Sequence, residues 1–162
     1  MSLSKLVVNA SPIISLAKIG HADLLLDLSG ELVVPKGVFE EIVTYKESDP
    51  AIQWVTIRKE ELIKDVTVPD KIFEWNLGKG ESEVIAYSIK NKEFTVAIDD
   101  KAAKKCAELY GIKVKGTISI IVNAKSAGLI PEIKPLLLNL KSSGFRIADF
   151  VIDSALRLAN EI

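Results

Sequence analysis

The chain has 162 residues, of which 48% are hydrophobic and 27% are charged, a composition typical of a globular domain. Its formal net charge is -1, so no overall basic character indicates a nucleic-acid-binding protein, and a polyanion would have to be held by a local patch or through a metal. Cys106 is the only cysteine, which excludes an intrachain disulfide and a zinc site built from several cysteines.

The sequence predicts strands that alternate with helices. In chain order we expect a strand at 5–9, helices at 12–19 and 22–28, a strand at 31–35, a helix over 38–43, a strand near 54–57, a helix near 71–76, a helix at 81–90, a strand at 94–98, a helix at 101–110, a strand at 112–115, a helix at 116–128 and two helices between 131 and 161. Ser11 suits an N-cap, and Pro12 suits the first position of the helix that follows.

Buried strands that alternate with helices predict an α/β fold with a parallel sheet covered on both faces. We find no internal repeat and no interdomain linker, so we expect one domain over 1–162. No signal peptide precedes the first strand, and no apolar run approaches the ~18 residues of a membrane-spanning helix. We therefore expect a cytoplasmic protein without a membrane partner.

Polar side chains follow three of the predicted strands. Asn9 ends the first strand, Asp99 and Asp100 end the strand from 94, and Thr117 follows the strand from 112. In an open α/β sheet these positions share the carboxyl edge, where ligands bind. Two carboxylates about 4 Å apart repel by roughly 4 kcal/mol at the effective dielectric of a protein surface. One of the two aspartates can cap the helix that follows. Two in a row exceed what capping needs, so we expect at least one to serve a site.

Helical periodicity separates one pair of glutamates and not another. Glu81 lies on the apolar stripe of its helix, so it is a candidate ligand, although a first-turn carboxylate also suits the helix dipole. Glu83 falls on the side that we expect to face solvent. Glu40 and Glu41 lie equally far from the middle of their stripe, and periodicity does not choose between them.

The order of these motifs resembles the PIN-domain superfamily, and most closely a prokaryotic branch of predicted nucleic-acid-binding PIN proteins. The resemblance extends from Lys5 to Ile130 and includes "SGFRIAD" at 143–149; the motifs that carry it are "VVNASPIISLAKIG", "VVPKGVFEEIV", "LGKGESEVIAYSIK", "VAIDDKAAKKCAELYGIKVKGT" and "AKSAGLI". It implies a three-layer α/β/α domain with a central parallel sheet, a core over about 5–130 and C-terminal helices over 131–162.

The resemblance also implies a site. It places metal ligands at Asn9, Glu41, Glu81, Asp99 and Asp100, with the four carboxylates as catalytic residues and Asp100 as the closer match of the aspartate pair. Ser11 and Thr117 occupy hydroxyl positions beside them. The metal would be Mg²⁺ or Mn²⁺, which prefer oxygen ligands. Asn9 departs from the family pattern, because in the family an acidic residue ends the first strand. The amide oxygen of Asn9 contributes no charge to a metal site.

Basic residues crowd around the aspartate pair: Lys101, Lys104, Lys105, Lys113 and Lys115. With Arg146 they suit contacts to an RNA backbone that do not read sequence. We expect Lys101, Lys104, Lys105 and Arg146, with Ser11 and Thr117, to bind substrate. The alternative for the lysines is a solvated helix face with a pairing to Glu108.

The sequence thus favours a metal-dependent endoribonuclease that hydrolyses RNA phosphodiester bonds, as the resemblance implies for a toxin-like component of a toxin–antitoxin pair. Its partners would be RNA, an antitoxin protein and a second copy in a homodimer. A PIN-fold module that binds RNA or protein without cleaving is the first alternative, and Asn9 favours it. A receiver-like phosphotransfer domain is the second.

Overall fold

The computed structural model describes residues 5–45 and 49–162, and its centre is a five-stranded sheet in which each adjacent pair of strands is parallel. The strands are β1 (Lys5–Val8), β2 (Glu31–Pro35), β3 (Ile63–Lys64), β4 (Thr95–Ala97) and β5 (Val114–Lys115), in the order β3-β2-β1-β4-β5. The chain therefore moves outward from β1 in one direction and from β4 in the other. The junction of β1 and β4 is the topological switch point, where open α/β sheets bind ligands.

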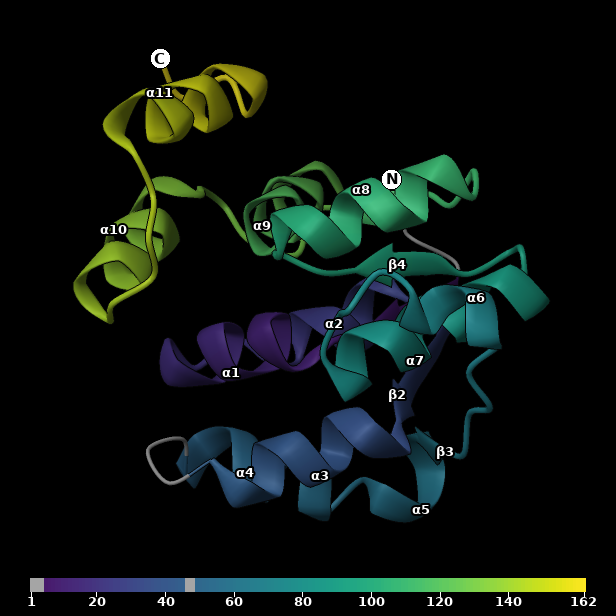
Figure 1. The fold of residues 1–162 in the computed structure, drawn as a ribbon. Coiled ribbons are helices and arrows are strands. Elements are labelled where there is room, and N and C mark those ends of the chain that lie inside the picture. The colour runs from purple at the N-terminus through teal and green to yellow at the C-terminus, as the bar shows by residue number, and fades with distance from the viewer. Residues whose placement is uncertain (1–4, 46–48) are drawn as a thin grey trace.

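Helices flank the sheet, which confirms the predicted α/β/α class (Figure 1). They are α1 (Ala10–Lys18), α2 (Leu24–Leu28), α3 (Lys36–Thr44), α4 (Asp49–Thr56), α5 (Lys59–Leu62), α6 (Asp70–Phe73), α7 (Lys79–Lys90), α8 (Lys101–Leu109), α9 (Thr117–Ser126), α10 (Lys134–Ser142) and α11 (Asp149–Leu158). Helix α7 packs against β1, β2, β4 and α3. Helices α10 and α11 lie at one end of the molecule, beyond α1 and α9.

The core explains why the short strands form. Leu6, Val7 and Val8 of β1 are fully buried, as expected of a central parallel strand with helices on both faces. Among the described residues, none of the helices has the length and apolar character that crossing a membrane requires.

Two local predictions are wrong. The segment near 54–57 is not a strand but the end of α4, whose buried residues Ala51, Trp54 and Val55 follow helical spacing. The outer strand is instead the two-residue β3 beside β2. The start of α1 also differs from the prediction: α1 begins at Ala10, so Ser11 is not its N-cap and Pro12 is its third residue rather than its first. Ser11 lies within the first turn, where its hydroxyl is free to bond outside the helix.

Substitution of a buried α7 residue tests how the sheet is covered. Ile85 is fully buried, whereas Leu109 at the end of α8 is 68% exposed. We expect Ile85→Ala to lower the free energy of unfolding by about 2–5 kcal/mol, through lost burial and a cavity. Leu109→Ala should change it by no more than about 0.5 kcal/mol. Urea denaturation measures both values, and equal effects would contradict this packing.

Candidate active-site cleft

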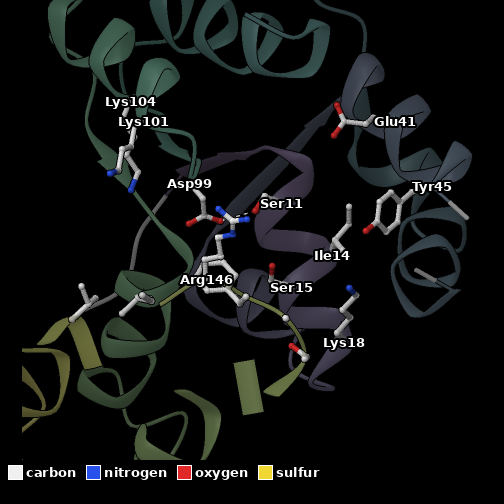
Figure 2. A pocket seen from close by; sticks show the side chains of 15 residues that line it. Ser11, Ile14, Ser15, Lys18, Glu41, Tyr45, Asp99, Lys101, Lys104 and Arg146 are labelled. Atoms are coloured by element: carbon white, nitrogen blue, oxygen red, sulfur yellow. Dashed lines mark hydrogen bonds between the residues drawn. The ribbon is translucent and has the colours of Figure 1, made fainter. Parts of the chain in front are cut away.

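A cleft of about 740 Å³ opens beside the switch point. Its walls come from α1, α3, the end of β4, α8, α9, the segment 143–146 and α11. The polar side chains lining it are Ser11, Ser15, Lys18, Glu41, Tyr45, Asp99, Lys101, Lys104, Ser143 and Arg146. Ser11, Ser15 and Lys18 recur at helical spacing, so α1 presents one continuous face to the cleft. Figure 2 shows Glu41 and Tyr45 on one wall and Lys101 and Lys104 on the other.

Asp99 lies at the end of β4 and has three hydrogen-bond donors. The Ser11 hydroxyl donates to its Oδ2 over 2.8 Å, and the Thr117 hydroxyl donates to the same oxygen over 2.7 Å. The Thr117 backbone N–H, at the start of α9, donates to Oδ1 over 2.8 Å. An anion at a helix N-terminus is stabilised by the unpaired amides and by the helix dipole. The three bonds fix this carboxylate between α1 and α9.

Positive charge lies beside Asp99. A Cβ atom at Gly116 would come within 3.1 Å of Asp99 Oδ1 and 3.2 Å of Lys104 Nζ, so the absence of a side chain there makes room for both groups. Lys101 and Arg146 also line the cleft, and the Arg146 side chain extends toward Asp99 and Ser11 (Figure 2). Lys105, which was expected to bind substrate, is exposed and does not line the cleft.

A second group of oxygen atoms meets beside Gly80, in the first turn of α7. A Cβ atom at Gly80 would lie 3.3 Å from Asn9 Oδ1 and 3.5 Å from Glu41 Oε1. Asn9 is only 5% exposed, and its Oδ1 has no hydrogen-bond partner. A buried amide oxygen without a partner is costly, and a bound cation is one way to satisfy it.

Glu41 has a perturbed carboxyl group. Its residue surface is largely exposed, but the cleft wall partly desolvates the carboxyl, and this desolvation, together with the nearby charge of Glu81, raises the pKa of Glu41. Glu81 itself accepts a hydrogen bond from the Gly78 N–H over 3.1 Å, which ties it to the start of α7. The structure thus brings Glu41 near Asn9 at Gly80 and near the charge of Glu81.

The remaining acidic candidates have local partners. Asp100 is exposed, and its Oδ2 accepts the Ala103 N–H over 2.9 Å as the N-cap of α8. The geometry therefore favours Asp99 over Asp100 as the carboxylate that faces the cleft. Helical periodicity could not choose between Glu40 and Glu41. In the structure Glu40 is paired with Lys79 over 3.0 Å at the surface. The expectation that Glu83 faces solvent is wrong, because Glu83 is 5% exposed.

The amide and carboxylate oxygens at this site are the ligand type that a hard divalent cation prefers, but too few of them lie together to complete its coordination shell. Within residues 5–45 and 49–162, no three acidic, histidine or cysteine side chains lie close enough together to hold a metal ion. Glu41 lies near the Asn9 oxygen and near the charge of Glu81, and Asp99 lines the same cleft as Glu41. Mg²⁺ keeps several waters and binds through as few as one or two carboxylates, so these residues would hold it with waters completing the shell.

The geometry defines a class of protein: a three-layer α/β/α domain with carboxylates and cations around a cleft at the switch point. The chain belongs to the PIN-domain family, whose model matches residues 5–161. PIN domains are generally nucleases and typically use a divalent metal. A comparison with curated proteins finds no match.

Sequence reasoning missed several residues of the cleft. Ser15 and Lys18 could have been inferred from Ser11, since four and seven residues later the same face of a helix recurs. Tyr45 and Phe145 gave no comparable signal, because their positions depend on how α3 ends and on where the segment 143–146 crosses the cleft.

The helix that precedes the segment 143–146, α10, is bonded at its start to the far end of the chain. Glu161 accepts the backbone N–H groups of Ile133 and Lys134 at the start of α10, over 2.7 and 3.1 Å, and pairs with Lys125 of α9 over 2.9 Å. Burial alone would raise the pKa of Glu161, but the Ile133 amide and the Lys125 ammonium hold it below its usual range. This clamp connects α9, α10 and the end of α11.

Because the pKa of Glu41 is raised, removing its charge should increase the stability of the folded protein, and the increase should depend on pH. A carboxyl with a raised pKa binds its proton more tightly in the folded state, so stability falls as the pH rises from the unfolded toward the folded value. We expect Glu41→Gln to raise the melting temperature at pH 7 and to have no such effect below pH 4.5, the unperturbed value. Thermal unfolding at both pH values measures this, and a gain that does not depend on pH would contradict it.

Proposed function

We propose that this protein is a metal-dependent endoribonuclease that hydrolyses RNA phosphodiester bonds, and that it serves as a toxin-like component whose partner is an antitoxin protein. The observation that carries the proposal is the cleft at the switch point, where the carboxylates of Glu41 and Asp99 and the cations Lys104 and Arg146 line one space. The buried, unpartnered Asn9 oxygen lies behind this wall, beside Glu41 at Gly80. This arrangement suits a cation together with a polyanion. Family membership supports the nuclease reading.

A bound Mg²⁺ or Mn²⁺ would supply a nucleophilic water and offset charge on the phosphate. The chain's own residues do the rest. Ser11 and Thr117 orient Asp99 through three hydrogen bonds, which preorganises the carboxylate before substrate arrives. Lys101, Lys104 and Arg146 offer positive charge to backbone phosphates, a contact that does not read sequence.

A second candidate is a PIN-fold module that binds RNA or protein without cleaving it. Two observations favour it: Asn9 contributes no charge, and the described residues hold no cluster of three acidic ligands. The receiver-like alternative gains nothing from the family match.

Cleavage of a single-stranded RNA with Mg²⁺, with Mn²⁺ and with EDTA separates the two candidates. We expect cleavage with either metal and none with EDTA. Asp99→Asn should lower the rate by at least about 10-fold, since even supporting residues of metal sites have that effect. Asp100→Asn, which keeps an oxygen for the α8 cap, should retain most of the rate.

The matched control is Asp27→Asn, a substitution of the same type at an exposed position of α2. Equal rates in Asp99→Asn and Asp27→Asn would remove Asp99 from the mechanism. RNA binding without cleavage by the wild-type protein would favour the second candidate.

Restoring a carboxylate at position 9 tests the incomplete ligand set. We expect Asn9→Asp to tighten Mn²⁺ binding by roughly 10-fold or more, because one added charge attracts a cation 4 Å away by several kcal/mol even at an effective dielectric of 20. Isothermal titration calorimetry measures the affinity. An unchanged affinity would place Asn9 outside the metal's ligands.

A further inference from the structure

Glu83 is the one charged side chain that is buried among the described residues, with 5% of its surface exposed. A buried carboxylate is costly unless it is hydrogen-bonded. The proposed function gives Glu83 no task, and it is absent from the lining of the cleft. Its burial therefore calls for a separate explanation.

The partner of Glu83 is the start of helix α3. The Gly37 backbone N–H donates to Glu83 Oε1 over 2.9 Å, although the two residues are 46 positions apart. Gly37 is the second residue of α3, so its amide is one of those that no helix carbonyl can satisfy. A carboxylate at this position also suits the positive end of the helix dipole.

The space around Gly37 is matched to this carboxylate. A Cβ atom at Gly37 would lie 2.5 Å from Glu83 Oε2 and 2.8 Å from Glu83 Cδ, closer than side-chain atoms pack. Helices α3 and α7 therefore approach each other at a glycine, and the carboxylate fills the space that a side chain would take.

The same two helices meet again one turn away with the roles reversed. Glu41 lies four residues after Gly37 on α3, and Gly80 lies three residues before Glu83 on α7, so each pair shares one helix face. Glu41 Oε1 lies 3.5 Å from a Cβ position at Gly80. Each helix thus sets a glycine against the other helix's glutamate, and one of these two glutamates faces the cleft.

We propose that Glu83 is a positioning residue: by holding the start of α3 against α7, it places Glu41 beside Asn9 and Glu81. The inference rests on the proposed function for its consequence, since the group that Glu83 positions is a candidate metal ligand. Glu83 itself acts on the metal only through α3.

The test compares Glu83→Ala with Glu83→Gln, which keeps an oxygen that can accept the Gly37 N–H. The control is Ser88→Ala on the same helix, because Ser88 is 1% exposed and donates to Phe94 O over 2.7 Å, away from α3. Mn²⁺ affinity is measured by calorimetry, folding by the melting temperature, and the order of α3 by hydrogen exchange of the Gly37 and Glu41 amides.

We expect Glu83→Ala to weaken Mn²⁺ binding by roughly 10-fold or more, as residues that orient metal ligands do, and to speed exchange in α3. Glu83→Gln should remain within about 3-fold of the wild-type affinity. Ser88→Ala should lower the melting temperature without changing Mn²⁺ affinity.

Two results would overturn the inference. Unchanged amide exchange of α3 in Glu83→Ala would show that Glu83 does not hold the helix. An equal loss of Mn²⁺ affinity in Glu83→Gln and Glu83→Ala would make Glu83 a metal ligand instead. If the wild-type protein binds no Mn²⁺, the proposed function fails, while amide exchange still decides whether Glu83 holds α3.

Discussion

The structure depends on the opposite directions in which the chain leaves β1 and β4. The two strands are parallel neighbours, so their carboxyl ends lie side by side, and the Asn9 N–H donates to Ala97 O over 2.9 Å. Asn9 and Asp99 follow these ends; α1, which follows β1, supplies Ser11, and α9, which follows the neighbouring strand β5, supplies Thr117. A parallel sheet with this strand order creates the cleft before any functional side chain is chosen.

Much of the fold could be predicted because its strands are continuous apolar runs and most of its helices carry one clear stripe. The failures have physical reasons. The strand near 54–57 was wrong because α4 buries Trp54 and Val55 next to each other, which a short window cannot distinguish from a strand. The prediction that Glu83 faces solvent is wrong because helical periodicity assumes a single buried face. Helix α7 is instead buried on several sides, at Gly80, Ser82, Glu83, Val84, Ile85, Ala86 and Ser88.

The candidate site was only partly readable. The sequence placed Asn9 and the aspartate pair at one edge, and the family resemblance selected Glu41, but it also favoured Asp100, whereas Asp99 is the aspartate that lines the cleft. The geometry distinguishes them through their donors: Asp99 is held by Ser11 and Thr117, and Asp100 by the start of α8. Two adjacent like charges are tolerated here because each carboxylate has hydrogen bonds of its own, so the pair does not require a shared cation.

The Glu161 clamp has a consequence for how the cleft responds to its surroundings. A carboxyl with a lowered pKa contributes stability that is lost as the pH falls through its folded value, so acidification would release the start of α10 from the end of the chain. The segment that carries Phe145 and Arg146 follows α10 directly. Acidic conditions therefore weaken the attachment of the helix from whose opposite end the chain enters the cleft.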